Sequence, residues 1–328
     1  MTSAEVPAGR VAVSSGISLR DVREAQARIR GYVHRTPVLT SAALDALTGA
    51  RLSFKCENLQ KVGAFKARGA HNAVLSLTDA EALPGVLTHS SGNHGAAVAL
   101  AARNRGIPAY VVMPSTTAEV KKSAVARYGG IVTYCEPTLR ARESVTERIR
   151  AETGADFVHP YNDMRVIAGQ GTAAVEFIEE VPDLDLLLCP VGGGGLLSGV
   201  AVAAKSLRPG IRVVGVEPAL ADDAQRSFRS GVLQPGTDAQ TIADGLRGAL
   251  GDKTFPLIRA HADDIVTVSE QAIVRAMRTI AEIMKLIIEP SSAVPVAALL
   301  EGAVSAREQR VGVILTGGNV DLDRLRWV

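Results

Sequence analysis

The sequence predicts an α/β fold, in which a mostly parallel sheet is covered by helices on both faces. Short apolar stretches of strand length alternate along the chain with longer helical stretches. The stretches at residues 184–191 and 311–315 are apolar almost throughout, as expected of parallel strands that are buried on both faces. Glycine-rich turns follow several predicted strands and lead into helices, which is typical of an α/β sheet.

The elements follow one another in a regular order. Ser18 and Asp21 form a capping box that predicts a helix ending near Gly31, and Thr36-Pro37 interrupts the pattern. The predicted strands are residues 51–57, 86–88, 109–113, 131–134, 184–191, 212–217, 265–268 and 311–315. The predicted helices are residues 67–77, 95–105, 119–128, 140–152, 171–181, 196–207, 270–285 and 291–300.

Composition limits the classes of function. The chain has 328 residues, 47% of them hydrophobic and 21% charged, which is enough for two lobes with a large core. A net charge of +2 indicates neither a nucleic-acid nor a membrane-surface partner, and no apolar run reaches membrane-spanning length. The widely spaced Cys56, Cys135 and Cys189 predict reduced thiols in a cytoplasmic protein.

A single lysine, Lys66, stands among small and apolar residues directly after a short polar turn at residues 57–63. A desolvated lysine has a lowered pKa and can act as a nucleophile or a base. Taken alone, the position also fits a helix lysine whose stem is buried while its ammonium stays in water. Two later glycine-rich stretches favour the functional interpretation.

The first of these stretches is residues 89–95, between a predicted strand and a helix. Small residues let the backbone approach a ligand there, and the free N–H groups of a helix start attract an anion such as a carboxylate. The stretch brings together Ser90, Ser91, Asn93 and His94. A capped helix start would explain one serine and one glycine and would leave the other polar residues without a role.

The second stretch contains four consecutive glycines, Gly192, Gly193, Gly194 and Gly195, after a buried strand. Their N–H groups can form a nest for a phosphate. Because no Gly-Lys-Ser/Thr follows and Ser198 replaces a third glycine, neither a P-loop nor a dinucleotide site fits, and the phosphate of a smaller cofactor is predicted. A flexible hinge is the alternative, although it is unexpected directly after a buried strand.

A third junction, residues 316–319, places the hydroxyl of Thr316 at the end of the last strand. A lysine, a phosphate nest and a hydroxyl at strand ends suggest a pyridoxal phosphate enzyme. The chain resembles the serine racemase and serine/threonine dehydratase family of fold type II, the tryptophan synthase β group, from about residue 21 to residue 321. The matching motifs are residues 65–70, 90–95, 166–172, 192–195, 241–245, 284–285, 289–291 and 317–321.

The resemblance implies an architecture. Two open, mostly parallel twisted sheets covered by helices would form a large and a small lobe, with the cofactor in the cleft between them. Residues 1–77 and 164–328 would make the large cofactor-binding lobe, and residues 78–163 the mobile substrate-binding lobe. The usual assembly of the family is a homodimer.

The resemblance also implies roles at the cofactor. Lys66 would form a Schiff base with pyridoxal phosphate and then remove the Cα proton of the substrate, and Phe65 would lie near the pyridine ring. Asn93 would hydrogen-bond the 3-hydroxyl oxygen. Residues 192–195, with Leu196, would hold the phosphate. Thr316, where the family commonly has serine, would face the ring nitrogen. A hydroxyl there makes the ring a weaker electron sink than a carboxylate would, which suits β-elimination.

Substrate residues are implied in the same way. Ser90, Ser91, Asn93 and His94 would bind the substrate carboxylate. Ser91 occupies the position where racemases keep a serine on the face opposite the lysine, so it could return a proton to Cα from the other side.

A divalent-cation site is implied by residues 217–223. The carboxylates of Glu217 and Asp223 and the carbonyl oxygen of Ala221 are hard ligands that suit Mg²⁺, Ca²⁺ or Mn²⁺. From the residues alone, a solvated acidic helix start would explain the same pattern.

The resemblance implies a dehydratase that converts L-threonine or L-serine to a 2-oxo acid and ammonia by α,β-elimination. Tyr161, after His159-Pro160, favours it, because serine racemases tend to have asparagine there. Alternatives are a serine racemase with side dehydratase activity and a threo-3-hydroxyaspartate dehydratase. In the latter Arg142 or Arg247 would meet the second carboxylate, although surface arginines explain both equally well. A β-replacement synthase, whose Ser-x-Lys-Asp-Arg pattern is missing, and a non-catalytic cofactor carrier are further alternatives.

Overall fold

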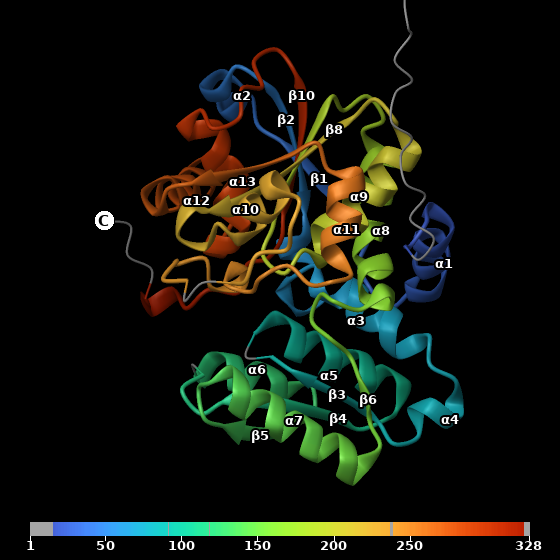
Figure 1. The fold of residues 1–328 in the computed structure, drawn as a ribbon. Coiled ribbons are helices and arrows are strands. Elements are labelled where there is room, and N and C mark those ends of the chain that lie inside the picture. The colour runs from blue at the N-terminus through green and yellow to red at the C-terminus, as the bar shows by residue number, and fades with distance from the viewer. Residues whose placement is uncertain (1–15, 91, 118, 237–238, 325–328) are drawn as a thin grey trace, which may run out of the picture.

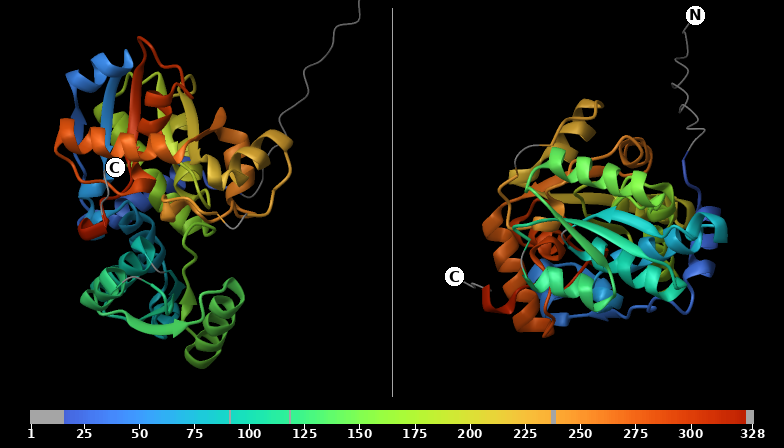
Figure 2. Two further views of the ribbon diagram at one scale, coloured as in Figure 1. Left: turned by 90° about the vertical axis from the view of Figure 1, so that its left-hand side faces the viewer. Right: turned by 90° about the horizontal axis from the view of Figure 1, so that it is seen from below.

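The computed structural model describes residues 16–90, 92–117, 119–236 and 239–324, and these form two lobes that are each built on their own sheet (Figure 1). The predicted α/β class with two mostly parallel, helix-covered sheets is confirmed. Seen from the side, the two lobes remain apart (Figure 2, left).

The larger lobe is built on a six-stranded sheet. Its strands, in spatial order, are β1 (Val38–Thr40), β2 (Arg51–Cys56), β10 (Arg310–Leu315), β7 (Leu186–Pro190), β8 (Arg212–Pro218) and β9 (Asp264–Val268). β1 pairs antiparallel with β2, and the remaining pairs are parallel. Parallel pairing brings the carboxyl ends of these strands to one edge, where ligands of α/β proteins bind.

Helices cover both faces of the larger sheet, because successive strand residues point to opposite faces. Leu186 and Leu188 lie in the core on one face, and Leu187 and Cys189 lie in the core on the other. The first face is covered by α2 (Ala42–Thr48), α12 (Glu270–Met284) and α13 (Pro290–Glu301). The second is covered by α1 (Leu19–Ile29), α8 (Met164–Glu180), α9 (Gly195–Leu207) and α11 (Thr254–His261), and α10 (Asp223–Ser230) lies near β9.

The smaller lobe has a four-stranded parallel sheet whose strands all lie between residues 86 and 157. Their spatial order is β5 (Ile131–Cys135), β4 (Ala109–Pro114), β3 (Val86–His89) and β6 (Asp156–Phe157). The helices of this lobe are α4 (Asp79–Ala82), α5 (Asn93–Arg105), α6 (Glu119–Arg127) and α7 (Leu139–Thr153). The boundaries of the substrate-binding lobe, at residues 78 and 163, stay a prediction.

Helix α3 (Lys66–Leu75) connects the lobes, because it packs on α8 of the larger lobe and on α5 of the smaller one. The crossing with α8 is made by two glycines. A Cβ atom on Gly169 would lie 2.6 Å from the Cα atom of Gly69, and one on Gly69 would lie 2.4 Å from Nε2 of Gln170. The two backbones therefore approach more closely than any larger residue would allow.

Several predicted boundaries were wrong. Helix α8 begins at Met164 and not at residue 171, and Gly169 and Gly171 lie inside it, where they permit close helix packing. Strands β1 and β6 and helices α2, α4, α10 and α11 were not predicted, because they are short. The capping box of Ser18 and Asp21 is confirmed. Among the described helices, none is both long and apolar enough to span a bilayer.

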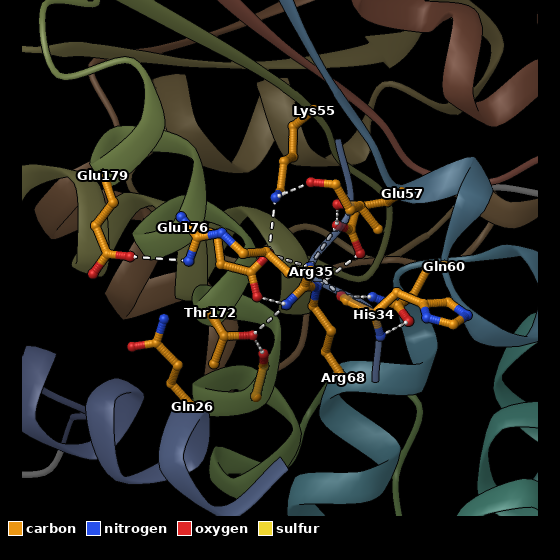
Figure 3. A network of polar contacts seen from close by, with 12 residues as sticks. Gln26, His34, Arg35, Lys55, Glu57, Gln60, Arg68, Thr172, Glu176 and Glu179 are labelled. Carbon is orange, nitrogen blue, oxygen red and sulfur yellow. Dashed lines mark hydrogen bonds and ion pairs between the residues drawn. The ribbon is translucent and has the colours of Figure 1, made fainter. Parts of the chain in front are cut away.

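A cluster of four buried charges lies where β2, α3 and α8 meet (Figure 3). Arg68 is fully buried and pairs with Glu57 and with Glu176, and the buried Lys55 donates to Glu176 at 2.8 Å. Burial opposes the charge of Arg68, but Glu57 and Glu176 outweigh it and raise the pKa of the guanidinium. Two positive and two negative charges therefore balance. We call these four residues, Lys55, Glu57, Arg68 and Glu176, the Arg68 cluster.

We expect Gly169→Ala to destabilise the protein by about 1 to 3 kcal/mol, because the added methyl group would overpack the crossing of α3 and α8. Denaturant unfolding would measure the change. Gly210→Ala is the matched control, since a Cβ atom there meets nothing within 4 Å. Equal stability of the two variants would contradict the proposed role of the glycine pair.

Candidate active site

The loop before Lys66 is fixed against the end of the last strand. The N–H of Phe65 donates to the carbonyl of Thr316 at 3.0 Å, and that of Gly318 donates to the carbonyl of Gly63 at 2.9 Å. These bonds bring Lys66 and Thr316 together although 250 residues separate them. Val62, in the same loop, has a φ of 58°, which is a strained value for a β-branched residue.

Lys66 is the first residue of α3, and its side chain is half-buried. Burial lowers the pKa of its ammonium to about 8, and the nearby Glu289 opposes this shift. Nζ donates to the carbonyl oxygen of Pro160 at 2.6 Å and lies 5.1 Å from the centroid of the Phe65 ring. The predicted desolvated lysine is therefore present, held between residues of two distant segments.

Glu289 is a residue of the site whose role the sequence did not indicate. It is buried at the start of α13, and burial raises the pKa of its carboxyl to about 7. Both of its oxygens accept from Nδ2 of Asn93, at 2.9 and 3.0 Å. In the sequence, Glu289 belongs to the motif at residues 289–291 that resembles the family, but its position before Pro290 is that of a common helix start and gives it no role.

Asn93 is held on its other side by Asn319, whose Nδ2 donates to Oδ1 of Asn93 at 2.9 Å. The orientation of the Asn93 amide is thus fixed from both ends. One N–H of Asn93 is engaged by the Glu289 carboxylate, which leaves its second N–H for an anionic oxygen such as that of the predicted cofactor.

The loop at residues 89–95 leads from β3 into α5. Oγ of Ser90 accepts from the N–H of Gly92 at 3.2 Å, so this serine forms a local turn. His94 is buried, and its Nε2 lies 3.1 Å from the carbonyl oxygen of Val158. Burial lowers its pKa well below the usual value, so the imidazole is neutral. Ser91 lies outside the described residues, and carboxylate binding by the loop stays a prediction.

The four glycines at residues 192–195 connect β7 to α9. Gly194 has a φ of 87° and precedes the helix, and no side chain caps the helix start. A Cβ atom on Gly193 would lie 2.4 Å from the ring of Tyr161, and one on Gly192 would lie 2.8 Å from Leu246. Side chains are excluded here and the N–H groups of Gly195 and Leu196 remain available, so the loop fits a phosphate.

Arg142 projects from α7 of the smaller lobe and is half-buried. Its Nε is buried without a hydrogen-bond partner, and no described carboxylate forms an ion pair with it. Burial, followed by the Arg142 charge, lowers the pKa of His89. The ring of His159 lies 5.7 Å from that of His89 and 4.6 Å from that of Tyr161, so the three rings form one group. Burial raises the pKa of Tyr161, and the charge of Arg142 opposes this rise. Arg247, the other candidate, donates to the carbonyl of Thr241 at 2.7 Å.

A cavity of about 920 Å³ opens between the lobes. Residues of both lobes line it, among them Asn93, Lys121, Arg247 and Asn319. It shares Asn93 with the site around Lys66, but Lys66, Thr316 and the glycine run do not line it.

The predicted metal ligands lie together at the end of β8. Glu217, Ala221 and Asp223 are all buried. Burial raises the pKa of Glu217 to about 9 and that of Asp223 to about 6. Neither carboxylate pairs with a described lysine or arginine. In the described part of the chain no three His, Cys, Asp or Glu side chains form a metal cluster, so a backbone ligand such as the Ala221 carbonyl would be needed.

Comparisons with known proteins agree with this geometry. The family model described as pyridoxal-phosphate dependent enzyme matches residues 29–317. The chain is 51% identical over 307 residues to β-hydroxyaspartate dehydratase of Paracoccus denitrificans, covering 94% of this chain and 98% of that protein. It is 48% identical over 320 residues to human serine racemase, covering 95% and 94%.

A solved structure is similarly close. Maize serine racemase superimposes with a TM-score of 0.92 at 47% identity, covering 94% of this chain and 95% of that one. The chain therefore belongs to the pyridoxal-phosphate dependent enzymes of fold type II, in the family of serine racemase, threonine deaminase and hydroxyaspartate dehydratase.

Proposed function

We propose that this enzyme dehydrates 3-hydroxyaspartate to oxaloacetate and ammonia by α,β-elimination. The observation that carries the proposal is Arg142, whose guanidinium has no acidic partner among the described residues and lies near enough to His89 to lower its pKa. The Nε atom of Arg142 is buried without a hydrogen-bond partner, and a second substrate carboxylate would supply both a partner and a counter-ion. Similarity to a β-hydroxyaspartate dehydratase supports the same choice.

Residues of the chain divide the work of this reaction. Lys66, with a pKa of about 8, is partly neutral near pH 7 and can accept the Cα proton. The glycine run and the start of α9 would hold the cofactor phosphate, Thr316 would face the ring nitrogen, and Asn93 would hold the 3-oxygen. When bound, the cofactor supplies an electron sink for the charge left on Cα. The β-hydroxyl leaves as water, and hydrolysis of the resulting enamine releases ammonia.

A second candidate is a serine racemase with side dehydratase activity. Similarity to the human and maize serine racemases favours it. It requires a proton donor on the face of Cα opposite Lys66, the role expected of Ser91. Dehydration of L-threonine has less support, because packing explains Tyr161: its ring fills the space beside Gly193.

We expect oxaloacetate and ammonia from 3-hydroxyaspartate at a higher kcat/KM than pyruvate or D-serine from L-serine, because only the first substrate engages Arg142. The holoenzyme would be incubated separately with threo- and erythro-3-hydroxyaspartate, L-serine and L-threonine, and each 2-oxo acid and D-serine measured. D-serine as the main product would replace this proposal by the racemase. A preference for L-threonine would restore the original prediction.

Arg142→Gln should lower kcat/KM for 3-hydroxyaspartate about 10- to 100-fold, because the variant can no longer form a charged hydrogen bond with the second carboxylate of the substrate. Steady-state kinetics with L-serine should change little. Arg148→Gln on the same helix is the matched control, since Arg148 is exposed and pairs only with Glu152. An equal loss for both substrates would mean that Arg142 supports the fold and not the choice of substrate.

We also propose that Glu217, Asp223 and the Ala221 carbonyl hold a divalent cation, with Mg²⁺, Ca²⁺ or Mn²⁺ as the candidates. A cation would offset the repulsion of two buried carboxylates that have no basic partner. Its position at the end of β8 indicates a structural role. The expected homodimer and the cytoplasmic location stay predictions.

Mg²⁺ at about 100 times its dissociation constant should stabilise the folded protein by about 2 to 3 kcal/mol. The pKa values of Glu217 and Asp223 are raised, so protons compete with the cation, and the stabilisation should be larger at pH 8 than at pH 5. Thermal unfolding with EDTA or Mg²⁺ would measure it. Asp223→Asn should abolish the effect, whereas Asp222→Asn should retain it, because Asp222 pairs with Arg226 on the surface. A pH-independent effect would contradict the assignment.

A further inference from the structure

The Arg68 cluster closes the loop that carries Lys66. Glu57 stands at the beginning of this loop and Arg68 at its end, 11 residues later, and Lys66 lies between them. Nε and Nη2 of Arg68 donate to the two oxygens of Glu57 at 2.7 and 2.8 Å. This bidentate pair fixes both distance and orientation between the two ends.

A second bidentate pair ties the closed loop to the larger lobe. Nη1 and Nη2 of Arg68 donate to the two oxygens of Glu176 on α8, both at 2.8 Å, and Nη1 also reaches Oγ1 of Thr172 at 3.2 Å (Figure 3). The planar guanidinium is thus engaged on every side. A lysine at this position could not reproduce two bidentate pairs.

Backbone hydrogen bonds fix the loop before α3 against the end of β10, but the first turn of the helix lacks the usual side-chain support. Phe65 precedes the helix and provides no side-chain cap, and the first turn contains no acidic residue. Successive helix residues are rotated by about 100°, so Lys66 and Arg68 project about 200° apart. Lys66 therefore faces the site while Arg68 anchors the back of the same turn.

Stability alone does not account for four charges inside the protein. Desolvation offsets much of the attraction in a buried ion pair, and apolar residues of similar volume often stabilise a fold as well or better. An arginine held by two bidentate pairs instead fixes the conformation of the segment that carries it. In this structure that segment also carries Lys66.

We propose that Arg68 is a positioning residue, which acts through Glu57 and Glu176 to direct the Lys66 amine toward the cofactor site. The proposal depends on covalent attachment of pyridoxal phosphate at Lys66. It does not depend on which amino acid is the substrate.

The test measures how fast the apoprotein binds pyridoxal phosphate covalently at Lys66. Borohydride would reduce and so trap the Schiff base at successive times, and mass spectrometry would measure the modified Lys66 peptide. We expect Arg68→Lys to lower this rate about 10- to 100-fold, since small misplacements of a reacting group have effects of that size. Circular dichroism and thermal melting would establish that the variant is folded at the temperature used.

Arg310→Lys is the matched control. Arg310 forms a bidentate pair with Asp185 at 2.9 and 2.6 Å, but it lies at the first residue of β10, at the opposite end of the strand from Thr316. Its replacement should lower the melting temperature without slowing capture. A folded Arg68→Lys variant that captures the cofactor as fast as the parent would overturn the proposal.

If Arg68→Lys does not fold, Glu176→Gln tests the same proposal. It preserves the shape of the side chain while removing one charge from the cluster. We expect slower capture in this variant as well, and a folded Glu176→Gln protein with the parental rate would equally overturn the proposal. Because no substrate is used, the result is independent of whether 3-hydroxyaspartate or serine is turned over.

Discussion

The function proposed for this enzyme depends on keeping one amine, that of Lys66, partly out of water. Burial of Lys66 lowers the pKa of its ammonium to about 8, while the carboxyl of Glu289 works in the opposite direction. Burial also raises the pKa of Glu289 to about 7, which weakens its hold on the lysine. The proton affinity of the amine is therefore set by burial, which favours its neutral form, against the Glu289 carboxylate, which favours its charged form, and the amine can exchange a proton near neutral pH.

Two kinds of buried charge surround that amine. The charges of the Arg68 cluster balance and its members are hydrogen-bonded to one another, so the group is rigid. Glu289 forms no ion pair with a described lysine or arginine, and burial raises the pKa of its carboxyl to about 7, so its ionisation can change. Rigid charges lie behind the lysine turn, and a titratable one lies among the site residues. The Arg68 cluster therefore holds the amine in place, whereas Glu289 adjusts its affinity for a proton.

The sequence predicted those elements and turns whose structure depends on neighbouring residues. Buried strands such as β7 and the turn into α9 were recognised because an apolar run ends in glycines, and Lys66, Asn93 and Thr316 were recognised as strand-end or turn residues. The start of α8 was misplaced, since a glycine that permits a close crossing looks like one that ends a helix. The motif at residues 289–291 was recognised, but the role of Glu289 was missed because its contact with Asn93 spans 196 residues and leaves no local pattern.

In the proposed assignment, most residues that take part in proton transfer lie in the larger lobe, and the residue proposed to select the substrate lies in the smaller one. Lys66, Thr316, Glu289 and the glycine run all belong to segments of the larger sheet or its helices, whereas Arg142 and His89 belong to the smaller lobe. Under this assignment, changes in the smaller lobe would alter the groups proposed to meet the substrate side chain and would leave Lys66 and Thr316 in place. Because α3 packs on both α5 and α8, it links the two sets of residues. One scaffold could in this way serve both a hydroxyaspartate dehydratase and a serine racemase, to each of which this chain is similar.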